Sequence, residues 1–369
     1  LIIYFPIFYI AVIIIQIVVA IGIINSNDNP DYKVPWLFFV MLIPIIGFMT
    51  YFMFYSRNIS KKQLKKNSRL KNCLVKDDSY TLEELEVTNP LAYSQAKCLK
   101  NLAETHIYQN TDITYMPSGE EMFSSLLQDL KRANEFIFLD YFIIEQGLFW
   151  NTILNVLKDK VSEGVEVRVV YDDIGCMTKL PGKYYKTLRK IGIYAIPFGI
   201  LKGQANNEFN NRNHRKITII DGKIAYTGGL NLADEYINHT KPYGHWKDVA
   251  IRLEGEAVDE LTRLFLYDYG ISDKKSNLEL DRYIKGYKKE CSGLCIPFGD
   301  GPKPIYNRRV AKTLIITMLG QAERYMYITT PYLIIDGELT SAIENASLRG
   351  VDVRIITPHI PDKKAVFMV

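Results

Sequence analysis

The chain has 369 residues, of which 48% are hydrophobic and 23% are charged, and its formal net charge is +4. This composition is typical of folded protein and excludes a disordered chain, and so small a charge does not by itself indicate a nucleic-acid-binding protein. Five cysteines, an odd number, favour reduced thiols in a cytosolic compartment, and the lone pair Cys291 and Cys295 does not supply the four ligands of a structural metal site.

Two apolar segments at the start of the chain predict a membrane anchor. Residues 1–24 and residues 36–55 contain no charged side chain. Each has about the 20 residues that a helix needs to cross a hydrocarbon core. The first segment lacks the positive n-region and the small-residue cleavage site of a signal peptide. We therefore expect residues 1–55 to form a hairpin of two transmembrane helices.

The charge after the second segment predicts the orientation of this hairpin. Residues 56–72 read SRNISKKQLKKNSRLKN, with seven lysines and arginines, whereas the connecting loop NSNDNPDYKVP has one lysine. The positive-inside rule then places the remainder of the chain in the cytoplasm. The same basic residues either attract anionic headgroups or serve only as a topology signal, and the two interpretations are compatible.

The residues after the anchor predict an α/β fold. Residues 56–108 form a polar, basic linker with some helix. Ser118 and Glu121 have capping-box spacing, and a helical apolar face follows at Met122, Leu126, Leu127 and Leu130. The next segments read as the strand EFIFLDYFII, the helix NTILNVLKDKVSEG and the strand VEVRVVYDD. A strand–helix–strand order predicts a parallel or mixed sheet covered by helices.

This pattern occurs twice. EGVEVRVVYD at 163–172 matches RGVDVRIITP at 349–358 in register, and the strand and helix before each segment also correspond, with a gap of three residues. We interpret the match as an internal duplication. Residues 109–300 are then a first lobe, and residues 301–369 are the start of a second.

Between the repeats, residues 213–231 read NHRKITIIDGKIAYTGGLN. Two β-rich runs joined at Asp-Gly predict a hairpin. Side chains two residues apart on a strand point the same way, so we expect His214 and Lys216 to share a face.

The residue types in this stretch suit a phosphate ligand. An imidazole can attack phosphorus, a lysine ammonium can stabilise charge on the oxygens, and Gly228 and Gly229 leave backbone that a ligand can approach. Asn231 adds an amide donor. Each of these residues alone is more often structural or solvated, and only their joint spacing indicates a site.

That spacing, HxK, four residues, D, six residues, GGxN, resembles the signature of the phospholipase D superfamily. Four further segments make the whole chain similar to bacterial cardiolipin synthases of this superfamily: HWKDVAIRLEG at 245–255, PFGDGP at 297–302, TTPYLI at 329–334 and TPHIPDKK at 357–364. The resemblance implies a phospholipase D-like mixed sheet sandwiched by helices, with one complete lobe and the start of a second.

The resemblance also implies a reaction that needs no metal or cofactor. The phosphatidyl group of one phosphatidylglycerol passes to another through a phosphohistidine, in an anionic bacterial cell membrane that the protein crosses more than once. His214 would be the nucleophile, while Lys216 and Asn231 would bind the phosphate. Asp221 belongs to the catalytic motif but is expected to brace the strand and turn. Asp248 would orient the histidine of the opposite lobe.

The chain departs from the family pattern because it contains a single HxK motif. It starts at Leu1 and stops at Val369, so we expect a fragment at both ends that is inactive alone unless two copies pair their motifs. Three alternatives stay open: a hydrolase that uses water, a synthase that uses another alcohol, and a non-catalytic protein that binds anionic lipid. Two membrane spans and the weak charge disfavour a nuclease. The oligomeric state, the acyl-chain preference and the identity of the nucleophilic histidine are not determined by the sequence.

Overall fold

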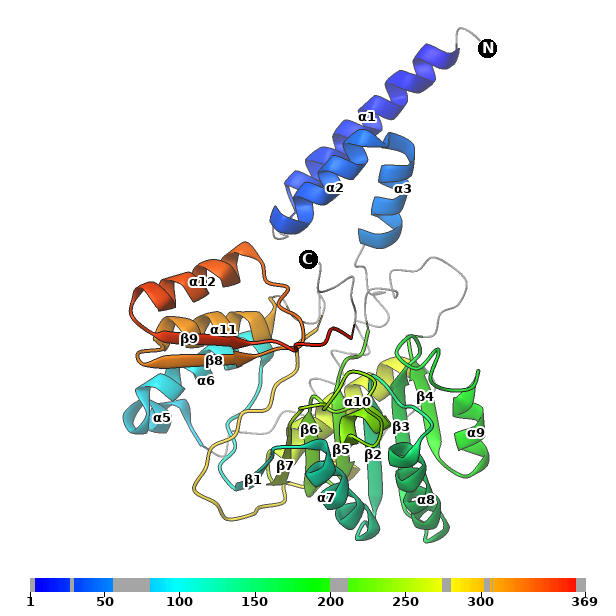
Figure 1. Cartoon of the computed structure of the whole chain (residues 1–369), viewed down its shortest axis with the longest axis vertical. Coiled ribbons are helices and arrows are strands. Elements are labelled where there is room, and N and C mark those ends of the chain that lie inside the picture. The colour runs from blue at the N-terminus through cyan, green and yellow to red at the C-terminus, as the bar shows by residue number, and fades with distance from the viewer. Residues whose placement is uncertain are drawn as a thin grey trace.

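The computed structural model describes residues 4–26, 30–55, 80–199, 212–273, 280–301, 306 and 308–362 (Figure 1). These residues form an N-terminal group of helices, a large α/β lobe, and a smaller group of helices around a two-stranded sheet. The basic segment 56–72, on which the predicted orientation depends, lies outside the described residues.

The N-terminal helices correct the prediction of two spans. Within the described residues only α1 (Tyr4–Ile24) is long and apolar enough to cross a membrane. The second predicted span is divided into α2 (Pro30–Leu42) and α3 (Pro44–Tyr55). Pro44 has no N–H to donate, and its ring clashes with the carbonyl four residues earlier, so the helix is interrupted there. Hydropathy alone did not reveal this break.

The large lobe contains a seven-stranded sheet in the order β1-β7-β6-β5-β2-β3-β4. Its strands are β1 (Thr111–Met116), β2 (Phe136–Tyr141), β3 (Glu166–Asp172), β4 (Tyr194–Phe198), β5 (Lys216–Ile220), β6 (Ile224–Gly228) and β7 (Ala250–Gly255). Strands β2, β3 and β4 pair in parallel, and every other neighbouring pair is antiparallel. The predicted mixed sheet is therefore confirmed.

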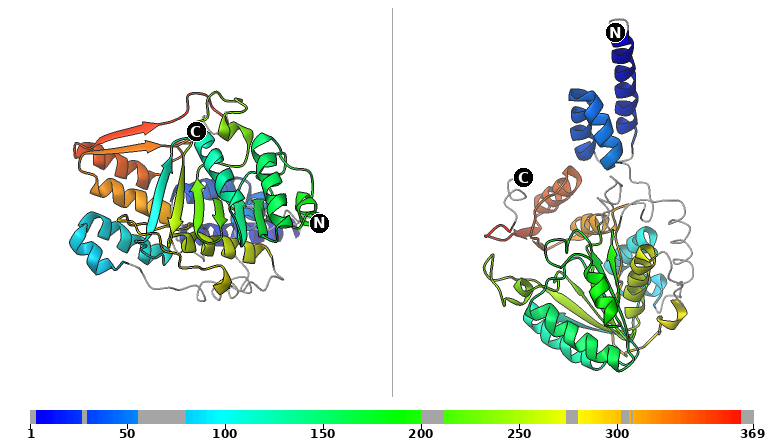
Figure 2. Two further views of the ribbon diagram at one scale, coloured as in Figure 1. Left: turned by 90° about the horizontal axis from the view of Figure 1, so that it is seen from below. Right: turned by 90° about the vertical axis from the view of Figure 1, so that its right-hand side faces the viewer.

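Helices cover both faces of this sheet, as predicted (Figure 2). The first face packs against α7 (Gly119–Lys131), α8 (Leu148–Ser162) and α9 (Tyr184–Lys190), and the second against α10 (Val258–Ser272). Trp150 is fully buried in the first layer, and Phe138 stacks on Phe265 in the second with ring centroids 4.5 Å apart. Helix α7 begins after Ser118, whose hydroxyl accepts the Glu121 N–H at 3.3 Å, so the Ser118 half of the predicted capping box is confirmed.

The predicted hairpin is also confirmed. Strands β5 and β6 pair antiparallel, and the turn between them contains Asp221 and Gly222, both with positive φ. Positive φ at both central residues is the pattern that matches the twist of a hairpin. The Lys223 N–H closes the turn on the carbonyl of Ile220 at 3.0 Å.

The smaller group combines residues that come before the large lobe in the chain with residues that come after it. It contains α5 (Leu82–Thr88), α6 (Pro90–Ala103), α11 (Val310–Gln321), β8 (Tyr325–Thr329), α12 (Gly337–Leu348) and β9 (Asp352–Ile356). Helix α6, in the predicted linker, packs on α11, and Leu99 and Val310 are buried there. Strands β8 and β9 pair in parallel around α12, in the same order as β2, α8 and β3.

Candidate active site

One edge of the large sheet collects the residues of the HxK motif. Because β5, β6 and β7 alternate in direction, the start of β5, the end of β6 and the start of β7 lie at the same edge. The ends of β2 and β3 reach this edge too, since β2 is antiparallel to β5. Five chain segments therefore converge around the first residue of β5.

His214 and Lys216 lie together at this edge, as predicted. Lys216 Nζ is 3.3 Å from His214 Nδ1 and donates to the His214 carbonyl at 2.8 Å. The imidazole is exposed, whereas Lys216 is 6% exposed. The Phe142 ring, just after β2, lies 4.7 Å from the His214 ring and 5.4 Å from the ammonium. The pair thus presents a reachable imidazole beside a shielded cation.

Burial changes the acid–base character of this edge. It lowers the pKa of Lys216 to about 8, although the Asp248 carboxylate opposes the shift. Burial also raises the pKa of the Asp248 carboxyl, while its hydrogen bond from the Val249 N–H and the Lys216 charge act in the other direction. A half-buried carboxylate and a weakly basic lysine therefore share the site.

Asn213, immediately before the histidine, rests on three buried carboxyl groups. Its side-chain amide donates to Asp140 Oδ1 at 2.7 Å and to Asp268 Oδ2 at 3.3 Å, and its backbone N–H donates to Asp172 Oδ2 at 3.1 Å. Arg215 forms an ion pair with Asp268. Together these contacts hold the backbone on both sides of His214.

The carboxyl group of Asp140 is the unusual member of this set. Asp140 is fully buried, and its Oδ2 has no hydrogen-bond partner among the described residues. Burial raises the pKa of Asp140 well above its ordinary value, and the neighbouring Asp268 carboxylate adds to the shift. Burial and the neighbouring Asp268 therefore favour the protonated form of Asp140, while Asp268 forms the ion pair with Arg215.

The glycine pair makes room for Asp248. A Cβ on Gly229 would lie 2.1 Å from Asp248 Oδ1, and a Cβ on Gly228 would lie 2.4 Å from the carbonyl of Val249. Neither glycine has a positive φ. The expected approach of a ligand to this backbone stays a prediction. In the structure, the segment just before β7 lies close to the two glycines.

Asn231 lies just beyond β6 and faces inward. Its Oδ1 accepts the Ile143 N–H at 3.0 Å, its Nδ2 donates to the Tyr236 hydroxyl at 2.6 Å, and the residue is 2% exposed. These contacts fix the segment after β2, which carries Phe142. The predicted contact of Asn231 with a phosphate remains untested.

Asp221 lies at the other end of β5, roughly 16 Å from Lys216 at the usual rise of a strand. Its carboxylate accepts three backbone N–H groups, of Asn134 at 2.9 Å, Glu135 at 2.8 Å and Phe136 at 2.9 Å. These contacts show the bracing expected of Asp221, and its assignment to the catalytic residues stays a prediction. Asp221 ties the β5–β6 turn to the start of β2.

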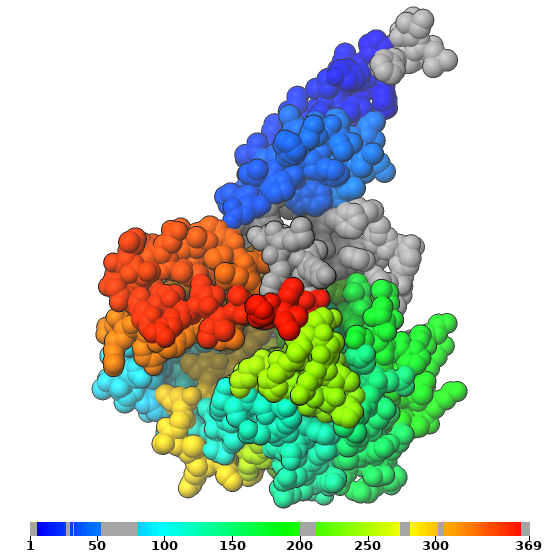
Figure 3. Space-filling model, in the orientation of Figure 1, coloured from blue at the N-terminus to red at the C-terminus, as the bar shows by residue number. Residues whose placement is uncertain are grey.

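The second part of the chain reaches toward this edge. In Figure 3 the red segment after β9 lies against the yellow-green loop before β7. A Cβ on Gly244 would be 3.4 Å from Ile360 Cδ1. Tyr332 donates to Asp362 on the same side. The two halves thus contact each other at the loop before β7.

Sequence patterns did not predict the residues that support the motif, namely Asp140, Asp172, Asn213, Arg215 and Asp268. One signal was present, because Asp140 interrupts an apolar strand where a carboxyl group is costly to bury. The described residues contain no group of three or more His, Cys, Asp or Glu placed to hold a metal ion.

Comparisons with known families agree with the geometry. Residues 126–266 and 315–368 match the family described as "Cardiolipin synthase, PLD-like domain", and residues 14–54 match "Phospholipase_D-nuclease N-terminal". The crystal structure of phosphatidylserine synthase from Haemophilus influenzae is similar with a TM-score of 0.52 over 72% of this chain and 66% of that chain. At 14% identity this likeness concerns the fold alone.

Relatives match almost the whole chain. An uncharacterized protein of Streptococcus mutans is 39% identical over 94% of this chain and 75% of its own length. Proteins named cardiolipin synthase from Oceanobacillus iheyensis and Halalkalibacterium halodurans are 33% and 31% identical, over 96% and 97% of this chain and 75% and 72% of their own lengths. The expectations of a fragment and of its inactivity gain no support from these matches.

The raised pKa of Asp140 predicts different effects for two amide substitutions. Asp140→Asn keeps the acceptor for Asn213 and places a donor beside Asp268, so we expect a stable protein. Asp268→Asn leaves the partly buried Arg215 without its counter-charge and should cost about 3–5 kcal/mol. Because the pKa of Asp140 is raised in the folded state, its contribution to the free energy of unfolding is complete at low pH. This contribution is lost as the pH rises toward the folded-state pKa.

Denaturation of the purified protein across pH 5 to 8 measures both effects. We expect Asp140→Asn to gain stability relative to the native protein as the pH rises. An Asp140→Asn variant that is as unstable as Asp268→Asn at every pH would contradict the assignment.

The packing of Gly229 predicts a coupled pair of substitutions. Gly229→Ala should destabilise the protein by about 1–3 kcal/mol, because its methyl group overlaps the Asp248 carboxylate. Gly182→Ala is the matched control, since a Cβ there meets no atom within 4 Å. Asp248→Ala should remove most of the cost of Gly229→Ala when the two are combined, as thermal unfolding would measure. If the destabilisation of the double variant equalled the sum for the two single variants, the proposed overlap would be refuted.

Proposed function

This chain belongs to the phospholipase D-like family that includes cardiolipin synthases, and on this basis we propose that it transfers a phosphatidyl group from one phosphatidylglycerol to another and releases glycerol. The observation that carries the proposal is the contact between the exposed His214 imidazole and the shielded Lys216 ammonium. A nucleophile beside a fixed positive charge suits attack on an anionic phosphodiester.

In the first proposed step, an imidazole nitrogen of His214 forms a bond to phosphorus. The bond from phosphorus to the oxygen of the headgroup glycerol breaks, and that oxygen takes a proton as glycerol leaves. Lys216 stabilises the charge on the non-bridging oxygens. Burial of Lys216 strengthens this interaction, because charges attract more strongly where the surroundings are less polar than water.

In the second proposed step, the terminal hydroxyl of another phosphatidylglycerol attacks the phosphohistidine. The hydroxyl gives up its proton, the phosphorus–nitrogen bond breaks, and His214 is restored. A second group must deliver and then remove the proton. We propose that this group is the histidine of a second HxK motif that faces the first, as the family resemblance implies.

The membrane helix supports a lipid substrate. Helix α1 is long and apolar enough to anchor the protein in the bilayer from which both phosphatidylglycerol molecules come. We propose that the catalytic part lies in the cytoplasm, which the basic residues 56–72 favour.

The role of His214 is tested by lipid analysis of a cardiolipin-deficient host that expresses the gene for this chain. We expect new cardiolipin, and we expect His214→Ala to reduce it by roughly 10³-fold or more, because the nucleophile is lost. His239→Ala, at an exposed loop position, is the matched control and should leave cardiolipin unchanged. Unchanged cardiolipin in the His214→Ala variant would exclude the assignment of His214 as the nucleophile. If the native protein produced phosphatidic acid and no cardiolipin, water would be identified as the acceptor.

The low pKa of Lys216 predicts the pH dependence of the reaction. Above about pH 8 the free protein loses the lysine charge, so kcat/KM should fall by about tenfold per pH unit. The value of kcat should fall less, because a bound phosphate keeps the lysine protonated. In Lys216→Arg the group stays charged, and the decrease above pH 8 should disappear even if the rate is lower. The same decrease in Lys216→Arg would assign it to another group.

A further inference from the structure

Helices α2 and α3 are too short to cross a bilayer, and they fold back on each other. They have 13 and 12 residues, or roughly 20 and 18 Å of helix, against a hydrocarbon core of about 30 Å. The rings of Trp36 and Tyr51 are 5.6 Å apart. A straight helix would separate these positions by roughly 22 Å. The start of α2 and the end of α3 therefore lie at the same end of the pair.

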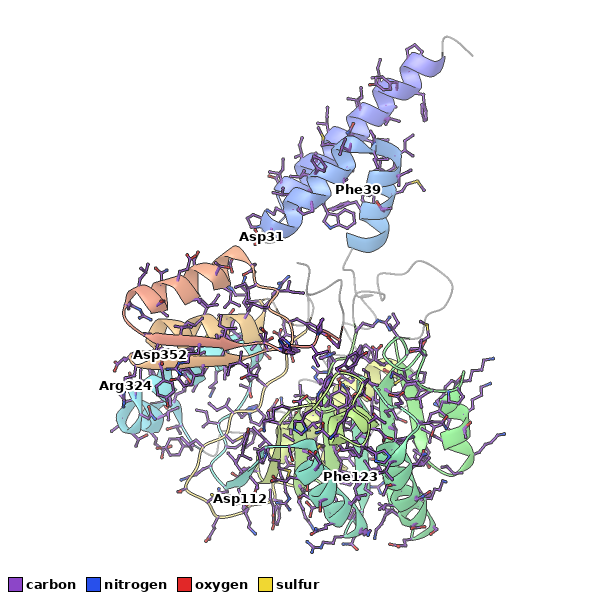
Figure 4. All side chains as sticks on the ribbon, viewed as in Figure 1. Asp31, Phe39, Asp112, Phe123, Arg324 and Asp352 are labelled. Carbon is purple, nitrogen blue, oxygen red and sulfur yellow. The ribbon has the colours of Figure 1, made fainter. Side chains whose placement is uncertain are left out.

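That end faces the globular part of the protein. Asp31, in the first turn of α2, accepts the Gly337 N–H at 3.0 Å at the start of α12 (Figure 4). The end of α1 lies here as well, because Lys33 Nζ donates to the Ile24 carbonyl at 2.9 Å. If the end of α1 and the start of α2 were on the opposite side of a membrane, Asp31 would not reach α12.

The apex of the pair is fitted for an apolar environment. The break at Pro44 deprives the preceding turn of a helical N–H donor. Gln16, from the middle of α1, supplies one: its Nε2 donates to the carbonyls of Val40 at 3.1 Å and Met41 at 2.9 Å. Backbone breaks inside a bilayer are tolerated only where such groups are satisfied by protein. Gln16 is the only amide side chain in α1.

Close packing on the inside and apolar side chains on the outside complete this arrangement. A Cβ on Gly47 would lie 2.7 Å from the Phe39 carbonyl, so glycine allows the backbones of α2 and α3 to approach each other. Phe39 lies between the two helices in Figure 4. The exposed residues of α2 and α3 include Phe38, Met41, Leu42, Ile46 and Met49. Such a surface requires an apolar solvent.

We propose that α1 crosses the bilayer once and that α2 and α3 enter it as a re-entrant hairpin from the face on which the globular part lies. The start of α1 then lies on the opposite face, and its end, with Asn25 and Ser26, and the first turn of α2 lie on the same face as the globular part. In the two-span hairpin expected from hydropathy, the start of α1 would lie on the same face as the globular part, and the end of α1 would lie on the opposite face. This inference concerns topology and does not depend on the proposed reaction.

Labelling with a membrane-impermeant maleimide separates the two topologies. Single cysteines would be introduced as Pro6→Cys, Asn25→Cys and Met177→Cys into the full chain with its five native cysteines replaced by serine. All three native side chains are exposed, and Met177 marks the face of the globular part. Labelling of opened membranes establishes that each thiol can react.

In intact cells we expect the Pro6→Cys variant to be labelled, and the Asn25→Cys and Met177→Cys variants to be protected until the membrane is opened. Labelling of Asn25→Cys from the face opposite to Met177→Cys would overturn the proposal. So would labelling of Pro6→Cys only from the face that Met177→Cys reports. Both results can be read without any measurement of activity.

Discussion

The contact between Lys216 and His214 depends on the backbone between them being held still, and buried carboxyl groups provide that support. Asn213 is bound by Asp140, Asp172 and Asp268, which come from three different elements of the lobe. The site is therefore built by tertiary contacts beneath a short sequence motif. An exposed imidazole can be positioned accurately because Asn213 below it is buried and hydrogen-bonded to three carboxyl groups.

The sequence predicted the local features of this arrangement well. The hairpin, its Asp-Gly turn and the shared location of His214 and Lys216 follow from short-range rules of chain geometry. The mixed sheet follows from the alternation of strands and helices. The resemblance found through the motif also identified the family to which the chain belongs.

Features that depend on distant contacts were not predictable in the same way. The sequence does not reveal that Gly229 accommodates Asp248, or that Asp221 binds the start of β2, because both partners are far away along the chain. The second apolar segment was predicted as a span because hydropathy counts side chains and ignores the hydrogen bond that Pro44 cannot make. Gln16 stabilises the resulting break from another helix.

The weak basicity of Lys216 also has a thermodynamic consequence. Above the pKa of about 8, a ligand phosphodiester that enters the site restores the ammonium, so binding takes up a proton from the solution. The heat of association then contains the ionisation enthalpy of whichever buffer supplies that proton. Calorimetry in two buffers of different ionisation enthalpy would therefore measure the number of protons taken up when the headgroup phosphate binds beside Lys216.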